Sequence, residues 1–254
     1  MVHPTTWVAH AFSLNLDRLR GLWQVNPMAP QPTTTDRSSR FLFNDADIRG
    51  SFVRLEESLK EVTQRHRYAE PLQNLLGEFL VAALLLSNTI KFKGRLTLQA
   101  KGDGPVKTMM AEATHDGKTR GIIQLNEDAD ETADFNAMFG NGVLAVTIEP
   151  MEGERYQSLV PLQGDTLASC LEHYFLQSEQ LGTLIHLTAN SDRAAGMLLQ
   201  QLPSQLVRDA GKREQHWQTV NILGNTLTHE ELLVKENQTI LHQLFSNEDI
   251  QLLA

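Results

Sequence analysis

The sequence predicts an α+β fold, in which an N-terminal domain with a mixed, largely antiparallel sheet and packed helices is followed by a helical linker region. Three observations predict it: alternating apolar runs joined by short turns, helical apolar stripes between those runs, and a change to polar, weakly patterned sequence beyond Pro203. The 254 residues, of which 41% are hydrophobic, suffice for a core of ordinary size. We expect a leader over 1–39, an α+β body over 40–203 and a helical linker region over 204–254.

The leader is expected to be flexible or dispensable. Large apolar residues recur at loosely helical spacing up to Trp23, and the proline-rich stretch from Pro27 cannot continue a helix. Polar residues interrupt the apolar stretch that a secretory signal needs. We favour translation from Met28, which leaves the upstream residues as surplus, over a functional leader or an organelle transit peptide.

The first half of the body alternates strands with helices. Short β-rich runs predict strands over 40–44 and 48–55, and apolar residues spaced four and three apart then predict a helix over 55–65. Pro71 suits the first turn of the next helix, whose apolar stripe is broad enough for a central buried position.

An apolar period of two resumes at Arg95, and it predicts an antiparallel meander because the turns are too short for parallel crossovers. Asp165 is expected to cap a later helix whose stripe contains Cys170. The predicted elements are strands over 95–101, 106–114, 120–125, 142–149, 156–162, 183–189 and 196–202, a short helix near 135–139 and the helix after Asp165.

The linker region reads as polar sequence over 204–224, followed by small helices. Thr228 and Glu231 have the spacing of a capping box ahead of Leu232, and Asn237 can cap the turn that follows. Helices this short are marginal alone, so the region must pack on the body, on a second chain or on another protein.

Charge and hydropathy exclude two classes of partner. The formal net charge is −9 with a pI near 5.5, and no run of Lys and Arg is long enough to follow a phosphate backbone, so we expect no nucleic acid partner. No apolar run approaches the ~18 to 20 residues of a spanning helix, so we expect a soluble protein without a membrane partner.

Residues that could carry chemistry are few. A single cysteine, Cys170, excludes an intramolecular disulfide and a thiolate cage for zinc within the chain. His173 lies three residues away and could act as its base, but Cys170 sits within an apolar stripe, where a cysteine behaves as a small hydrophobe. The histidines lack metal-site spacing, and the acidic stretch 127–131 lacks the pattern of a calcium loop. Alternating strands on both sides favour a hairpin turn over a phosphate loop at 102–105.

Several stretches, in this order, resemble the redox-regulated bacterial chaperone family, the heat-shock protein of thirty-three kilodaltons. The resemblance covers about 40–245, and its motifs are specific. The matching stretches are Gly102-Asp103-Gly104-Pro105, Gly140-Asn141-Gly142, Glu152-Gly153-Glu154-Arg155-Tyr156-Gln157, Gly164-Asp165-Thr166-Leu167-Ala168-Ser169-Cys170-Leu171-Glu172, Tyr174-Phe175, Ser178-Glu179-Gln180-Leu181 and Ala195-Gly196-Met197-Leu198-Leu199-Gln200.

The resemblance implies an ATP-independent holdase of the cytoplasm that binds unfolding proteins under oxidative and heat stress. It implies a compact α+β domain, a helical linker wrapped on it, and a C-terminal zinc domain with paired cysteines in CxC and CxxC form. In the family, oxidation joins these cysteines, zinc leaves, the linker loosens and the protein dimerises.

The chain departs from the family at this switch. It ends at Ala254, about where the zinc domain would begin, so we expect the zinc domain, its ligands and a bound zinc to be absent, and Cys170 is not a switch cysteine. Without a domain that packs on the linker, we expect a holdase that is constitutive or insensitive to oxidants, and no enzyme. The alternatives are an inactive remnant with the linker docked shut, a dimeric assembly module and, less favoured, a thiol enzyme at Cys170.

Candidate site residues follow from the linker and from the resemblance. Unfolded client proteins are the expected partner, and a homodimer is possible. The client-binding candidates are Leu232, Leu233, Leu241, Leu244 and Phe245. The family-motif residues, expected to be structural, are Gly102, Gly104, Gly140, Gly142, Gly153, Glu154, Arg155, Tyr156, Gly164, Asp165, Cys170 and Gly196.

Overall fold

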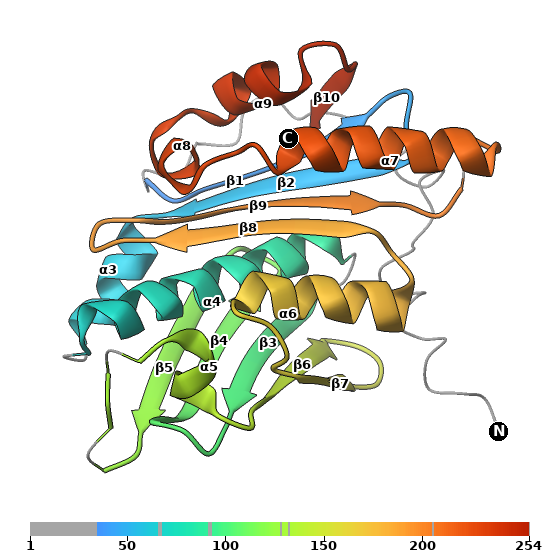
Figure 1. The fold of residues 1–254 in the computed structure, drawn as a ribbon. Helices are drawn as coiled ribbons and strands as arrows, with labels where there is room; N and C mark the ends of the chain where they lie inside the picture. Colours follow the sequence, from blue (N-terminus) through green and yellow to red (C-terminus); the bar gives the residue numbers. More distant parts are fainter. Residues whose placement is uncertain are drawn as a thin grey trace, which may run out of the picture.

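The computed structural model describes residues 35–253, apart from 66, 67, 91, 92, 128, 132 and 205. Two five-stranded antiparallel sheets lie on either side of a long helix, and three further helices cover the outer face of one sheet (Figure 1). The α+β prediction is confirmed, but the strands form two sheets where one was expected. Most of the predicted leader lies outside the described residues, and its last residues, 37–39, already belong to the first strand.

Sheet A has the strand order β10-β1-β2-β9-β8, and sheet B has the order β5-β4-β3-β6-β7. Sheet A contains β1 (Arg37–Phe43), β2 (Ile48–Leu55), β8 (Thr183–Ala189), β9 (Ala194–Gln201) and β10 (Ile250–Leu253). Sheet B contains β3 (Gly94–Lys101), β4 (Val106–Thr114), β5 (Thr119–Leu125), β6 (Val143–Pro150) and β7 (Tyr156–Pro161). The predicted meander is therefore the β3–β4–β5 part of sheet B.

The central helix α4 (Glu70–Thr89) is buried between the two sheets and begins with Pro71 at its first turn, as expected. Helix α4 can approach sheet A this closely only because β9 has a glycine at position 196, where a Cβ would lie 2.5 Å from Val81 Cγ1 of α4. The preceding helix α3 (Glu57–Gln64) is capped from a distance, since the Asp36 carboxylate accepts hydrogen bonds from the backbone N–H groups of residues 56–58.

Helix α5 (Phe135–Phe139) lies at the end of sheet B, and α6 (Leu167–Tyr174) continues into the π-helical turn η1 (Phe175–Glu179). The prediction that Asp165 caps α6 is wrong. The N-cap residue is Thr166, one position after Asp165, and it forms a capping box with Ser169. Thr166 Oγ1 accepts from the Ser169 N–H at 3.1 Å.

The linker region contains more structure than the sequence indicated. Its polar stretch holds the 15-residue helix α7 (Ala210–Gly224), capped by Asp209, where weakly patterned sequence was expected. Helix α8 (His229–Val234) has the predicted capping box. The predicted Asn237 cap is wrong, because Asn237 is the first residue of α9 (Asn237–Phe245) and its side chain donates to Ser39 Oγ at 2.9 Å. Strand β10, which pairs with β1, was not predicted.

The buried apolar residues form two clusters that match these layers. The larger cluster lies around α4, between the sheets. The smaller one, the second core, lies between sheet A and helices α7 to α9 and contains Phe41, Phe43, Phe52, Met197, Leu199, Val220, Leu227, Leu232, Ile240, Leu241 and Phe245. No helix in the described part of the chain has the length and apolarity that crossing a membrane requires.

Candidate functional site

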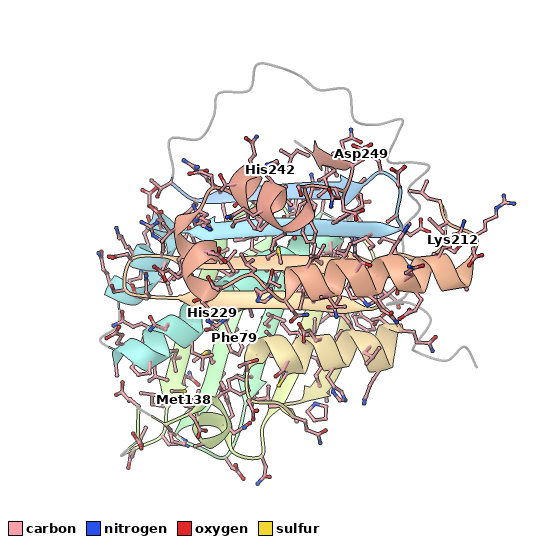
Figure 2. All side chains as sticks on the ribbon, turned by 45° about the horizontal axis from the view of Figure 1, so that its top comes forward. Phe79, Met138, Lys212, His229, His242 and Asp249 are labelled. Carbon is pink, nitrogen blue, oxygen red and sulfur yellow. The ribbon has the colours of Figure 1, made fainter. Side chains whose placement is uncertain are left out.

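The five client-binding candidates lie together, on the face of α8 and α9 that packs on sheet A. Leu232, Leu241 and Phe245 are at most 7% exposed, and Leu233 and Leu244 are half-buried against the second core. In this conformation the five side chains pack toward sheet A, and their role in client binding stays a prediction. Helices α8 and α9 lie over the outer face of sheet A (Figures 1 and 2).

Two arginines, Arg54 of β2 and Arg193 in the turn before β9, hold the C-terminal end of α8. Arg54 Nη2 donates to the backbone oxygens of Leu232 at 3.0 Å and Lys235 at 2.6 Å, and Arg193 Nη1 donates to the backbone oxygen of Leu233 at 3.1 Å. Positive charge is favourable at a helix C-terminus, where the carbonyl groups lack partners. The sequence analysis did not predict these arginine contacts, although a charged residue inside the apolar strand β2 was a usable signal.

A buried carboxylate holds the segment before α7. Asp47 is 3% exposed and accepts hydrogen bonds from the backbone N–H groups of Leu206 at 2.8 Å and Val207 at 3.1 Å. Arg213 of α7 lies 3.5 Å from the same carboxylate. The linker region is therefore docked by apolar packing and by polar contacts at its start and at the end of α8.

The motif glycines bring backbone segments into close approach. A Cβ at Gly102 would lie 1.8 Å from the backbone oxygen of Phe139, so the β3–β4 turn can reach α5 only with a glycine there. Gly140 has a φ of 58°, and a Cβ would lie 2.1 Å from Asp103 Oδ1. Asp103 in turn accepts from the Asn141 side-chain amide at 3.1 Å and from its N–H at 2.8 Å, and these bonds lower the pKa of the Asp103 carboxyl group. Besides Gly196, described above, the other motif glycines in such tight positions are Gly104, Gly142 and Gly164.

Cys170 belongs to the larger core cluster and is 1% exposed. Burial raises the pKa of its thiol to about 11, so the reactive thiolate is scarce at neutral pH. His173, on the exposed side of the helix, contacts Gln177. The geometry therefore contradicts a thiol enzyme at Cys170. Asp165, the neighbouring motif residue, accepts from Asn136 Nδ2 at 3.1 Å.

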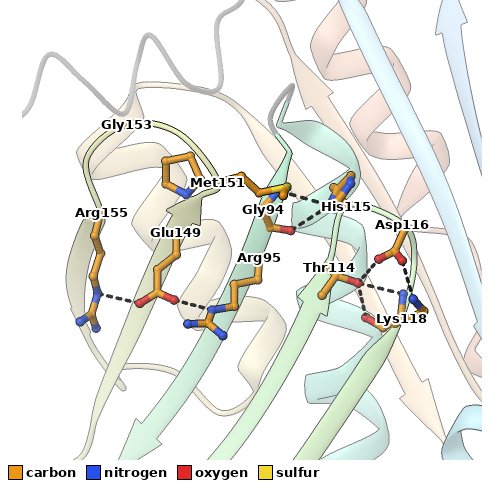
Figure 3. Close-up of a pocket in the computed structure, with 11 residues that line it drawn as sticks. Gly94, Arg95, Thr114, His115, Asp116, Lys118, Glu149, Met151, Gly153 and Arg155 are labelled. Atoms are coloured by element: carbon orange, nitrogen blue, oxygen red, sulfur yellow. Dashed lines mark hydrogen bonds and ion pairs between the residues drawn. The ribbon is translucent and has the colours of Figure 1, made fainter.

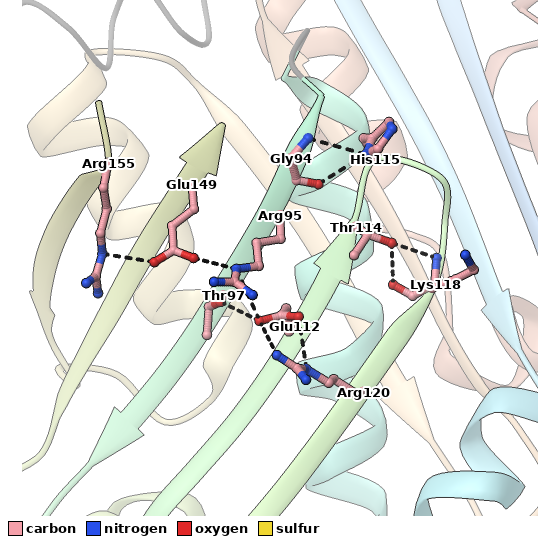
Figure 4. A network of polar contacts seen from close by, with 10 residues as sticks. All are labelled: Gly94, Arg95, Thr97, Glu112, Thr114, His115, Lys118, Arg120, Glu149 and Arg155. Atoms are coloured by element: carbon pink, nitrogen blue, oxygen red, sulfur yellow. Dashed lines mark hydrogen bonds and ion pairs between the residues drawn. The ribbon is translucent and has the colours of Figure 1, made fainter. Parts of the chain in front are cut away.

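The motif segment before β7 contributes to a ladder of charges across sheet B. Arg155 lies 3.3 Å from Glu149, which also bonds Arg95, and Glu112 lies 3.8 Å from Arg95 and 2.9 Å from Arg120. The alternating side chains stand on one face of the sheet, away from α4 (Figure 4). Three more motif residues lie near Arg155. Gly153 is in the turn with a φ of 112°, Glu154 is exposed, and Tyr156 begins β7.

A cleft of about 640 Å³ opens at the end of this ladder, between the β4–β5 turn at 115–118 and the β6–β7 turn at 151–155 (Figure 3). Its charged groups are already compensated, with Lys118 Nζ 2.8 Å from Asp116 and both arginines paired with Glu149. Within the described ranges, no group of three or more His, Cys, Asp or Glu could hold a metal ion.

A second buried carboxylate lies next to the Tyr174 hydroxyl. Glu179, at the end of η1, is 7% exposed and accepts a hydrogen bond from the Tyr174 hydroxyl at 3.1 Å. Burial raises the pKa of Glu179 to about 7. This group lies within the family motif that the sequence singled out.

Comparisons with known proteins agree on one family. The family model described as Hsp33 protein matches residues 36–254. A 33 kDa chaperonin of Pseudomonas fluorescens is 44% identical over 219 residues, which are 86% of this chain and 73% of that relative. A 33 kDa chaperonin of Pseudomonas aeruginosa is 46% identical over 219 residues, which are 86% of this chain and 74% of that relative.

A solved structure shows the same fold. The crystal structure of a 33 kDa chaperonin from Thermotoga maritima superposes with a TM-score of 0.70 at 23% identity, covering 85% of this chain and 77% of that one. The relatives are named as chaperonins and not as enzymes. The family model and the Pseudomonas relatives, each matching well over half of the chain, show that this protein belongs to the Hsp33 family and has a stress-related chaperone function.

Proposed function

We propose that this chain is an ATP-independent holdase of the cytoplasm that binds unfolding or oxidatively damaged proteins and prevents their aggregation. The observation that carries the proposal is the second core: an apolar face of sheet A is covered by helices α7 to α9, of which α8 and α9 are too short to be stable on their own. Undocking these helices uncovers apolar residues on both sides, and these surfaces would bind exposed apolar segments of a client.

The proposal includes activity that does not depend on oxidation. The sequence has one cysteine, and it is buried with a raised thiol pKa, so neither a disulfide within the chain nor a thiolate zinc site is available in these residues. We therefore propose no zinc cofactor for this chain. Docking of the linker would be set by its packing and by the polar contacts of Arg54, Arg193 and Asp47.

An inactive remnant is the second candidate, and the docked position of α7 to α9 favours it. The two are separated by light scattering of a heat-denatured test protein, with reductant and then with peroxide. A holdase without a switch suppresses aggregation equally in both. Suppression only after oxidation would contradict the proposed lack of a switch, and no suppression in either condition would favour the remnant. A dimeric assembly module would form dimers without capturing unfolded protein.

A further inference from the structure

The two sheets end in four edge strands, and these edges differ in how their backbones are occupied. Sheet A ends at β8 and β10, and sheet B ends at β5 and β7. An edge strand presents backbone N–H and C=O groups that can pair with another extended chain unless something covers or occupies them.

Side chains occupy two of these edges at mid-strand. On β5, the Tyr68 hydroxyl donates to the backbone oxygen of Ile123 at 2.9 Å and accepts from its N–H at 3.1 Å. On β8, a Glu172 carboxylate oxygen accepts from the Ile185 N–H at 2.7 Å. The third edge, β10, belongs to the linker region, so its place depends on linker docking.

Edge β7 has no such occupant among the described residues, in which no side chain hydrogen-bonds to the backbone of 156–160. In an antiparallel pair, every second residue directs its N–H and C=O away from the partner strand, so this stretch presents them at the free margin of sheet B (Figure 1). Pro161 ends the stretch because it has no N–H to donate.

Exposed apolar side chains are concentrated beside this edge. Val143 is 43% exposed, Met151 73% and Leu159 67%, and all three belong to the β6–β7 hairpin. Val143 pairs with Pro161 and Leu159 with Ala145, so the side chains of Val143 and Leu159 stand on the outer face of sheet B. An added strand could place apolar side chains over them.

The same outer face is more positive than the rest of the chain. Its strands carry the basic residues Arg95, Lys101 and Arg120, with Lys101 on the same side of β3 as Arg95, against the acidic residues Glu112 and Glu149. The strands of this face therefore carry one more basic than acidic group, in a chain of net charge −9. This charge complements carboxylates on an incoming chain.

We propose that the β7 edge binds an extended, acidic and apolar segment of an unfolded polypeptide by strand addition. Backbone groups of 156–160 pair with the segment, and Leu159 and Val143 receive its apolar side chains. This inference rests on the proposed function, because it names the surface on which a client would be held.

The test uses the full chain and reduced, carboxymethylated α-lactalbumin, a permanently unfolded acidic polypeptide, as the probe. Leu159→Lys places a charge beside the edge, and Leu176→Lys is the matched control, since Leu176 is 63% exposed but lies on η1. We expect Leu159→Lys to weaken probe binding about tenfold and Leu176→Lys to leave it unchanged. Val143→Lys repeats the test if the first variant does not fold.

Residue-resolved amide hydrogen exchange identifies the binding mode. We expect alternate amides of 156–160 to exchange about tenfold more slowly with the probe bound. Unchanged exchange in β7, or equal binding by Leu159→Lys and the wild type, would overturn the inference while leaving the holdase in place. If the β7 amides of the dimeric protein already exchange slowly without the probe, a second copy of the chain occupies this edge, and the inference is overturned. If the wild type binds no probe at all, the proposed function itself fails.

Discussion

Phe245 is the side chain on which docking of the linker helices depends most directly. It is 2% exposed in the second core, and its ring meets the Phe43 ring edge to face at a centroid distance of 5.3 Å. We predict that Phe245→Ala releases α8 and α9 from sheet A and leaves the core around α4 intact.

The magnitude follows from burial and from the shortness of the helices. Truncating a buried Phe to Ala costs roughly 3 to 5 kcal/mol. Helices of six and nine residues are marginal alone, so this cost falls on their docking equilibrium. At about 1.4 kcal/mol for each factor of ten, a loss of about 3 kcal/mol raises the undocked fraction roughly a hundredfold.

Amide hydrogen exchange and aggregation assays check this prediction. Amides of α8 and α9 should exchange roughly a hundredfold faster in Phe245→Ala, while α4 amides keep their rates, and the variant should suppress aggregation more strongly than the wild type. The control is Phe79→Ala, since Phe79 is fully buried in the larger cluster and its loss should weaken the whole domain. If Phe245→Ala speeds amide exchange in α4 as much as in α9, the linker helices do not undock independently of the core, and the reasoning is refuted.

Three further predictions concern single sites. Burial raises the folded pKa of Glu179 to about 7 from an ordinary 4.5, so its contribution to stability is lost as the pH rises from 4.5 through 7. As the pH rises from 4 to 8, the free energy of unfolding of Glu179→Gln should therefore increase by roughly 1 to 3 kcal/mol relative to that of the wild type. Melting temperatures of the two proteins that change equally with pH would contradict this. Gly140→Ala should cost more than about 2 kcal/mol in denaturant unfolding, because its Cβ meets Asp103, whereas Gly117→Ala, also at positive φ but with open space around it, should cost only about 1 kcal/mol. Cys170→Ala should cost roughly 1 to 2 kcal/mol and leave light scattering with peroxide unchanged, and a changed response would give the thiol a regulatory role.

Local pattern in the sequence was enough where neighbouring residues decide the structure. The alternation at 106–114 predicted β4 to the residue, and the Thr228 capping box predicted the start of α8. Sequence also identified the motif glycines, because turns and close approaches of the backbone select glycine locally. The resemblance to the family rested on the same motifs.

Elements were missed where the deciding partner is distant in sequence. Helix α7 buries only Val220 and Gly224, so its apolar stripe is too weak to recognise, and the four residues of β10 become a strand only by pairing with β1. The division into two sheets depends on the pairing of β9 with β2, which no local pattern encodes.

The candidate site shows the same division. Sequence alone identified apolar stripes on α8 and α9, but a stripe has the same spacing whether it meets a client or packs on its own sheet. Tertiary structure decided that these residues are docked, because the aromatic face of sheet A and the arginines at positions 54 and 193 converge on them from distant parts of the chain. Tertiary structure likewise decided which sheet edges are occupied. The Tyr68 hydroxyl bonds the backbone of β5, which lies far along the chain, and the Glu172 carboxylate of α6 bonds the backbone of β8.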